Sequence, residues 1–385
     1  MPVRWMRQWA RCRRLDILVL LTSLVIPGAM KAQTWTWTTE GVDIDGTDTS
    51  IIVDQEGNLH VSYSFSAGGE LRYAFRPAGN PHWFKMTLDK GLGVFYSRIT
   101  VDAQGNPHIC YTPRIMKYAH FDGRHWSVQQ VDPGGGLVAY TCSIRMGADG
   151  TPRLSWYVES GVFLRYAEFK DGVWMARTLD AEGLPGKWHS LVLDSNGLPR
   201  IAYIQFPWGR LKYTAFDGKQ WNTVILDQPV TNPGDNLERG FGASLALDGK
   251  GNPLISYYDL QSLKMARLVD GKWEKGVIEQ LPPFGQWAWK NFRSTLVLDS
   301  KGNPHVGFES LQGLEHAWWD GKQWRSQLIV APVGATFFES AMTIDRNDNL
   351  YISFRDPGDG SLRVAIGHPG SSMQNARTET PKSAN

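Results

Sequence analysis

The sequence predicts an all-β protein, a seven-bladed β-propeller with four-stranded antiparallel blades. Residues 244–279 read as four short strands joined by turns, and the same pattern recurs seven times along the 385-residue chain. Successive copies are 45 to 54 residues apart, which is the spacing of propeller blades and exceeds that of leucine-rich or ankyrin repeats. Four short strands bury too little surface to be stable alone, so the copies must stack on one another.

The two ends of the repeat array complete each other. The last copy ends after its third strand at residues 362–366, whereas Trp37 and Asp43 near the start repeat the spacing of a fourth strand. We therefore expect residues 37–42 to complete the seventh blade. This closure would remove the exposed sheet edge that an open array leaves.

Each copy has the same order of elements. Its first strand is apolar at alternate positions and runs into an aspartate that opens a Gly- and Asn-rich turn, which favours chain reversal. The second strand carries a small residue before an aromatic one, a pattern that lets neighbouring blades pack face to face. An Asp-Gly turn then joins the third strand to a fourth strand that begins with tryptophan. We expect the second-strand aromatic residues in the core; they are Tyr63, Tyr111, Trp156, Tyr203, Tyr257, Phe308 and Phe354.

Both ends of the chain differ from the repeats. Five arginines before residue 15, an apolar run at residues 15–27 and small residues near Ala32 are typical of a secretory signal peptide. A retained N-terminal anchor is the alternative. We expect a signal peptide at 1–32, the propeller at 33–368 and a polar, disordered tail at 369–385. These boundaries predict a secreted or periplasmic protein.

The composition restricts the partners. The chain is 42% hydrophobic and 20% charged with a formal net charge of +2, which argues against nucleic acid as the main partner. After removal of the signal peptide no segment is long and apolar enough for a membrane, and we expect a monomer without a cofactor. Asp235, Asn236 and Glu238 match no calcium-loop spacing, so no metal site is predicted.

Two cysteines follow the predicted signal peptide. Cys110 and Cys142 stand at positions where other copies carry Ser, Ala or Gly. We interpret them as two small buried residues. An oxidising compartment would also allow a disulfide between neighbouring blades.

Short motifs recur between residues 37 and 366: Gly-Asn-Pro before the second strand, Leu-Lys/Arg-Tyr-Ala in the third, and Asp-Gly-Lys-x-Trp before the fourth. This repeat style resembles that of bacterial secreted propellers grouped as sialidase-like or BNR-type. The Asp-box S-x-D-x-G-x-x-W is absent, because here the aspartate opens the turn and the tryptophan stands on another strand. Sialidases also have six blades, so their catalytic residues are not carried over as a set. Some seven-bladed polysaccharide lyases, with His, Tyr and Arg in their site, are similar in fold alone.

One set of positions departs from the repeat and marks a candidate site. In a propeller the first strand of each blade lines the central channel, so the positions six residues before the repeat aspartate should ring one mouth. They are Asp48, Tyr96, Thr141, Trp188, Gly242, Arg293 and Glu339. An aromatic, an acid and a base from separate blades are typical of a polar ligand site. The alternative is a set of ion pairs that hold neighbouring blades together.

Further candidate ligand-binding residues lie near this mouth. They are Arg98 and Arg145 deeper in the channel, Tyr258, Glu309 and Arg355 at the ends of second strands, and Trp208, Trp287 and Trp289 in long loops. Tryptophan stacks on the apolar face of a sugar ring, so this surface suits a glycan. The alternative is that the loop aromatics plug the channel.

The candidate catalytic residues are His189, Tyr96, Glu339 and Asp48. His189 stands beside Trp188, where a lyase or hydrolase would need a base. The recurring His60, His108 and His305 lie on different blades at the opposite face, and we expect them to pack within turns.

Two classes of function remain. The first is a propeller that binds a carbohydrate or protein ligand around the channel mouth. The second is a glycan-active enzyme, either a polysaccharide lyase using His189, Tyr96 and an arginine, or a sialidase-like glycoside hydrolase using Glu339 or Glu309 with Asp48 and the arginines. No recognisable motif enforces a catalytic pair, so we favour binding.

Overall fold

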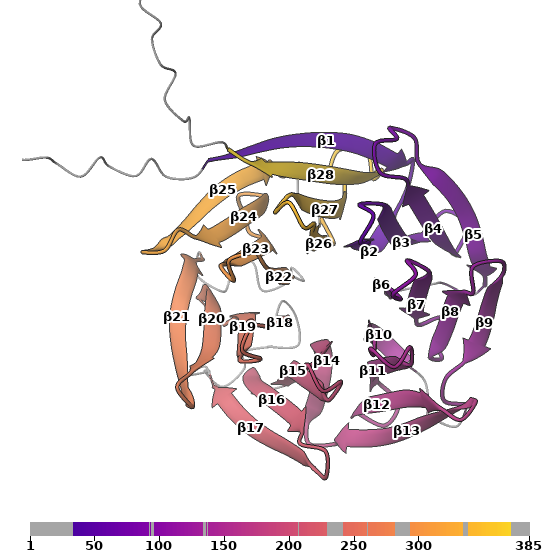
Figure 1. The fold of residues 1–385 in the computed structure, drawn as a ribbon, viewed down its shortest axis with the longest axis vertical. Helices are drawn as coiled ribbons and strands as arrows, with labels where there is room; N and C mark the ends of the chain where they lie inside the picture. The colour runs from indigo at the N-terminus through magenta and orange to yellow at the C-terminus, as the bar shows by residue number, and fades with distance from the viewer. Residues whose placement is uncertain are drawn as a thin grey trace, which may run out of the picture. The chain divides into compact units, whose positions relative to one another are not determined.

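The computed structural model of the chain describes residues 34–91, 93, 96–133, 136, 138–206, 208–228, 242–259, 261–281, 293–333 and 338–370. These residues form seven four-stranded antiparallel sheets around a central axis (Figure 1), which confirms the predicted seven-bladed propeller. The predicted signal peptide and almost all of the predicted tail lie outside the described residues. Within the described ranges, the chain has no helix with the length and apolar character that a membrane span requires.

Each blade is a meander that runs from an innermost strand at the axis to an outermost strand at the rim. We number the blades 1 to 7 in the chain order of their innermost strands, so that blade 1 begins with β2 and blade 7 with β26, and each list below follows this order. The innermost strands are β2 (Thr47–Val53), β6 (Ser97–Val101), β10 (Val138–Met146), β14 (Leu184–Leu193), β18 (Ala243–Leu247), β22 (Ser294–Leu298) and β26 (Ala341–Ile344). The second strands are β3 (Leu59–Phe65), β7 (Pro107–Tyr111), β11 (Pro152–Val158), β15 (Pro199–Phe206), β19 (Pro253–Tyr258), β23 (Pro304–Glu309) and β27 (Leu350–Arg355).

The outer half of each blade consists of a third strand and a rim strand. The third strands are β4 (Glu70–Arg76), β8 (Lys117–Phe121), β12 (Phe163–Lys170), β16 (Arg210–Phe216), β20 (Ser262–Val269), β24 (Leu314–Trp319) and β28 (Leu362–Pro369). The outermost strands are β5 (Phe84–Lys90), β9 (Trp126–Gln130), β13 (Val173–Asp180), β17 (Trp221–Asp227), β21 (Lys272–Gln280), β25 (Trp324–Val330) and β1 (Trp35–Asp43).

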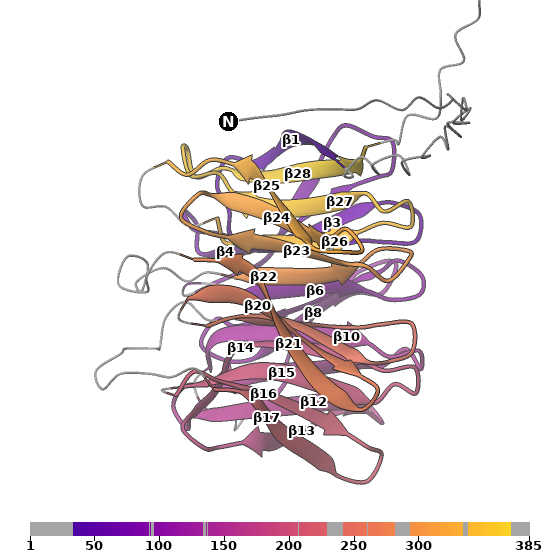
Figure 2. The ribbon, with the colours of Figure 1, turned by 90° about the vertical axis from the view of Figure 1, so that its left-hand side faces the viewer.

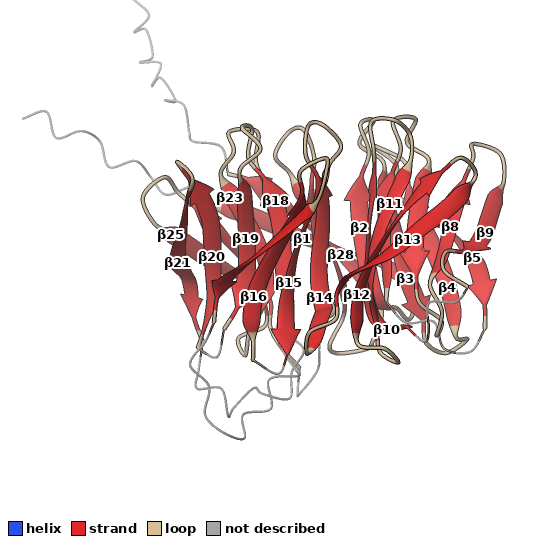
Figure 3. Ribbon diagram, turned by 90° about the horizontal axis from the view of Figure 1, so that it is seen from below, coloured by secondary structure: helices blue, strands red, loops and turns tan. Residues whose placement is uncertain are grey.

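The strands run between two faces of the ring (Figures 2 and 3). The turns that join first to second and third to fourth strands lie on one face, which we call the turn face. The second-to-third loops and the connections between blades lie on the other, the loop face. The starts of the innermost strands, where the non-repeating positions occur, therefore meet at the loop face.

The ring closes as the sequence predicts. Strand β1 pairs antiparallel with β28, from Trp35 opposite Pro369 to Asp43 opposite Leu362, and completes the sheet of blade 7. Its first residue, Trp35, is buried against His305 and His316 of blade 6. The closing strand thus satisfies the open edge of β28 and also supplies core surface to a neighbouring blade.

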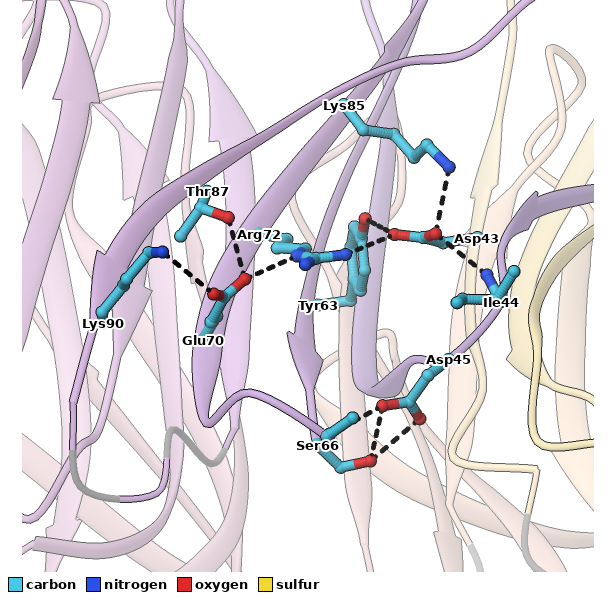
Figure 4. A network of polar contacts seen from close by, with 11 residues as sticks. Asp43, Ile44, Asp45, Tyr63, Ser66, Glu70, Arg72, Lys85, Thr87 and Lys90 are labelled. Carbon is cyan, nitrogen blue, oxygen red and sulfur yellow. Dashed lines mark hydrogen bonds and ion pairs between the residues drawn. The ribbon is translucent and has the colours of Figure 1, made fainter.

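A polar contact joins most neighbouring blades. Asp43, on the outermost strand of blade 7, accepts a hydrogen bond from the Tyr63 hydroxyl of blade 1 (2.6 Å) and forms an ion pair with Arg72 (3.1 Å) (Figure 4). The equivalent tyrosine–aspartate bonds, each 2.7 Å, are Tyr111–Asp89, Tyr203–Asp180 and Tyr257–Asp227. At the other three boundaries Asp132 is matched with Trp156, Glu279 with Phe308 and Val330 with Phe354, so no tyrosine–aspartate bond can form there.

The second-strand aromatic residues and the turn histidines pack as expected. All seven second-strand aromatics are buried. His60 binds the Tyr73 hydroxyl through Nδ1 (2.7 Å) and Asp54 through Nε2 (3.1 Å), within the turn-face half of its own blade. His108 makes the equivalent contacts with Tyr118 and Asp102.

The interpretation of the two cysteines as separate small residues is wrong. Cys110 on β7 and Cys142 on β10 form a disulfide between blades 2 and 3, with their Cα atoms 6.3 Å apart. Both positions face the same blade boundary, which a single sequence repeat does not reveal. Because both strands lie in the inner half of their blades, the bond links the blades close to the channel wall.

Candidate functional site

The non-repeating residues meet across the axis at the loop face. Asp48 lies on β2 and Trp188 on β14, whereas Tyr96 precedes β6, Arg293 precedes β22 and Glu339 precedes β26. Asp48, Trp188 and Arg293 are buried, and Tyr96 and Glu339 are half-buried. Five blades therefore contribute to one compact cluster, which we call the mouth cluster.

Arg293 is the centre of the mouth cluster. Its Nη2 donates to Asp48 Oδ1 at 2.8 Å, a contact that links blade 6 to blade 1. The guanidinium carbon lies 4.6 Å from the ring centre of Trp188 and 5.4 Å from that of Tyr96, within the range of cation–π attraction. Arg293 Nε and Nη1 are buried and form no hydrogen bond within the described part of the chain.

Three members of the mouth cluster adopt an uncommon backbone conformation. The φ angles are 49° at Asp48, 57° at Tyr96 and 48° at Glu339, at the same position of three consecutive blades. Residues with a Cβ atom rarely adopt this left-handed conformation, and it persists where surrounding contacts enforce it. Such clustered strain is characteristic of ligand and active sites.

The two carboxyl groups of the mouth cluster differ in environment. Asp48 is ion-paired with Arg293, whereas Glu339 Oε2 accepts a hydrogen bond from the Asp48 backbone nitrogen at 2.9 Å. Burial of the Glu339 carboxyl, together with the negative charge of Asp48, raises its pKa to about 7, against the opposing effect of Arg293. Glu339 thus has the protonation behaviour of a proton donor near neutral pH.

The raised pKa of Glu339 predicts a pH dependence of stability. A carboxyl group that holds its proton more tightly in the folded state stabilises the fold fully below its unfolded pKa of 4.5, and this contribution disappears as pH rises through about 7. We expect the free energy of unfolding of the wild type to fall, relative to Glu339→Gln, across this interval. Urea denaturation of both proteins at pH values spanning it measures the difference, and parallel curves would contradict the prediction.

Arg98 on β6 and Arg145 on β10 lie deeper in the channel wall. Each is half-buried, and each donates through Nη1 to a nearby backbone carbonyl of its own strand, Ser97 O and Ile144 O, at 2.8 Å. Neither forms an ion pair with a described residue. Burial, followed by the positive charge of Arg293, lowers the pKa of Arg98 to about 10; burial also lowers that of Arg145. The negative charge of Asp48 acts on Arg98 in the opposite direction, but no described residue forms an ion pair with either cation.

His189 is buried between blades 3 and 4. Its Nδ1 lies 2.8 Å from the carbonyl oxygen of Gly186, and its Nε2 has no hydrogen-bond partner among the described residues. Burial lowers the pKa of His189 to about 4, although the carbonyl groups of Gly186 and Ser155 act in the opposite direction. The imidazole is therefore neutral at pH 7.

Two of the predicted ligand-binding residues, Tyr258 and Glu309, form contacts between blades. The Tyr258 hydroxyl lies 3.1 and 3.0 Å from the carbonyl oxygens of Arg293 and Glu309. The Glu309 carboxylate accepts a hydrogen bond from Ser340 N at 3.0 Å. These contacts connect blades 5, 6 and 7.

The remaining predicted residues do not join the mouth cluster through any contact described. Arg355 is half-buried at the end of β27, with Nε unpaired within the described chain. Trp208 is 36% exposed in the loop after β15, and Arg210 lies over its ring at 4.7 Å. Trp287 and Trp289 lie outside the described residues.

The described residues contain no group of three or more His, Cys, Asp or Glu side chains that could hold a metal ion.

No protein-family model and no curated protein matches the chain. Among solved structures, it is similar to the Aleuria aurantia lectin in complex with Fucα1-6GlcNAc, at 16% identity and a TM-score of 0.50, over 77% of this chain and 100% of that one. It is also similar to the SapL1 lectin in complex with α-methyl fucoside, at 16% identity and a TM-score of 0.52, over 76% and 99%. The polysaccharide lyase Uly1 matches at 12% identity and a TM-score of 0.53, over 83% and 89%.

These similarities support the propeller fold, and at such low identity they show nothing beyond it. They include both binding proteins and an enzyme. The choice between the two classes therefore rests on this chain's own residues.

Proposed function

We propose that this protein is a secreted or periplasmic, monomeric glycan-binding propeller, and that its channel binds the carboxylate of an acidic sugar. The observation that carries the proposal is the pair of half-buried cations, Arg98 and Arg145, neither of which has the negative charge of an ion-pair partner among the described residues. A bound carboxylate would supply that charge and accept paired hydrogen bonds from the planar guanidinium groups. The basic and apolar residues before Pro27 support export.

The electrostatics of the channel support an anionic ligand. Arg293 is already paired with Asp48, and the raised pKa of Glu339 reduces its negative charge near neutral pH. Arg98 and Arg145 thus leave the site with an excess of positive charge, which attracts anions and disfavours cations. The solved propellers of similar fold include lectins in complex with fucosides and a polysaccharide lyase, which supports a glycan as the carrier of the anion.

The test compares ligands that differ only in charge. Immobilised polygalacturonate and alginate are offered to the mature protein beside the same polymers after chemical reduction of their carboxyl groups. We expect binding to one or both acidic polymers, weakening with added salt, and no binding to the reduced forms. Equal binding to acidic and reduced polymers, or binding to neither, would overturn the proposal.

A second candidate function, cleavage of the bound glycan, is favoured by the different environments of Glu339 and Asp48. A carboxyl group held protonated near neutral pH beside one paired with an arginine is the arrangement that general acid catalysis of glycoside hydrolysis requires. Reducing-end release from acidic oligosaccharides would reveal hydrolysis, and it should disappear in Glu339→Gln with binding retained. A rise in ultraviolet absorbance from unsaturated ends would instead indicate a lyase, for which His189→Ala and Tyr96→Phe are the relevant variants.

A further inference from the structure

A groove lies between blades 5 and 6 at the turn face, whereas the mouth cluster lies at the loop face. It has a volume of about 460 Å³, and Met265, Gly276, Asn303, Trp319 and Trp324 are among its lining residues. The equivalent groove between blades 3 and 4 measures about 130 Å³ and is lined at the matching positions by Tyr166, Arg177 and Trp221, among others. Only the larger value falls within the range of about 300–1,000 Å³ typical of small-molecule sites.

Two residue changes account for the larger groove. At four other blade boundaries a third-strand tyrosine contacts the tryptophan of the next blade at ring distances of 5.1 to 5.4 Å; the pairs are Tyr73–Trp126, Tyr118–Trp174, Tyr166–Trp221 and Tyr213–Trp273. In blade 5 this tyrosine is replaced by Met265. The third residue after the rim tryptophan, which covers the same groove, is Gly276 in blade 5, whereas the other blades carry Glu40, Met86, Gln129, Arg177, Val224 and Gln327.

Gly276 has no local structural requirement for glycine. It lies inside strand β21, and its φ angle is not positive. A Cβ atom built on it would meet no other atom within 4 Å. Glycine weakens a strand, and within one it often marks a place where a ligand approaches the backbone closely. Gly276 and Trp324 both line the groove, and no side chain at position 276 occupies it.

The groove has an aromatic floor and a polar rim. Trp319 and Trp324 meet edge to face at 5.9 Å. On the rim, Arg267 and Glu274 form an exposed ion pair at 2.8 Å. The Asn303 amide nitrogen donates one hydrogen bond to Asp299 at 2.9 Å, which leaves the amide oxygen and the second N–H of this side chain for a ligand.

We propose that this groove is a second carbohydrate site, which binds a pyranose ring of a neutral glycan. The apolar C–H face of such a ring stacks on an indole, and its hydroxyl groups both donate and accept, as the Arg267–Glu274 pair and Asn303 require. An ionic ligand would have to displace one member of that pair, and a wholly apolar ligand would leave the polar rim desolvated without partners. The site is independent of the carboxylate site proposed in the channel.

The test fills the groove without removing a core residue. Gly276→Gln introduces the residue that blades 2 and 6 carry at this position, and the open space around Gly276 accommodates it. The matched control is Val224→Gln, which introduces the same residue at the equivalent, exposed position of blade 4. Maltohexaose, cellohexaose, mannohexaose and xylohexaose are the probes, and saturation-transfer NMR and tryptophan fluorescence titration measure binding.

We expect at least one of these hexasaccharides to bind the wild type and Val224→Gln equally, and to bind Gly276→Gln at least about tenfold more weakly, a difference of about 1.4 kcal/mol. The channel variants Arg98→Gln and Arg145→Gln should retain this neutral-glycan binding. The proposal is overturned if none of the four probes binds the wild type, if Gly276→Gln binds as the wild type does, or if Val224→Gln is equally impaired.

Discussion

Trp35→Ala should lower the free energy of unfolding by about 3–5 kcal/mol, the cost of replacing a buried tryptophan in a core with alanine. Trp35 is 4% exposed on the closing strand β1. Its ring lies 5.2 Å from that of His305 and 4.9 Å from that of His316, both in blade 6. The substitution therefore loosens blade 7 from blade 6 as well as leaving a cavity. Urea denaturation followed by circular dichroism measures the change.

Ile44→Ala is the matched control for this prediction. Ile44 directly follows the same closing strand but is 80% exposed, so its truncation should change stability by no more than about 0.5 kcal/mol. Equal stability of the two variants would mean that β1 contributes little to closure, contrary to its pairing with β28.

Arg98→Gln and Arg145→Gln should each weaken binding of an acidic glycan by roughly 10- to 100-fold. A hydrogen bond to a charged group contributes about 1.5–3 kcal/mol, and every 1.4 kcal/mol corresponds to a factor of ten. Glutamine keeps part of the length and polarity of arginine, so the loss reports the charge and the paired donors. The variants should also bind with a weaker salt dependence, because fewer charges meet the ligand. Titration with oligogalacturonates at two salt concentrations measures both effects.

Arg325→Gln controls for a general loss of positive charge. Arg325 is an exposed residue on the outermost strand of blade 6, paired with Asp320 at 2.8 Å. It lies far from the inner strands, so affinity for the acidic ligand should not change. If Arg325→Gln weakened binding as much as the channel variants, the attraction would belong to the whole surface and the channel site would be wrong.

The two proposed carbohydrate sites differ in how far the amino-acid sequence alone indicates them. The Arg98–Arg145 pair stands out because most copies carry small or apolar residues at the channel positions. The groove between blades 5 and 6 does not stand out in the sequence, because its signal is the absence of a side chain at Gly276 and the replacement of a tyrosine by Met265. An alignment of the seven copies at the third position after the rim tryptophan would have revealed it. The tyrosine–aspartate pairing between blades could have been found in the same way.

The amino-acid sequence alone determined the number of blades, the closing strand and the core positions, because each follows from local patterns repeated seven times and from the need to bury a sheet edge. The tertiary structure decided which side chains meet. Arg293 and Asp48 form an ion pair although they are 245 residues apart in the sequence. The residue types at these two positions do not recur in the other copies, so the repeat pattern does not predict the contact. The disulfide, the buried setting of Trp188 and the raised pKa of Glu339 have the same origin, because each depends on distances and desolvation between blades that a pattern within one blade does not contain.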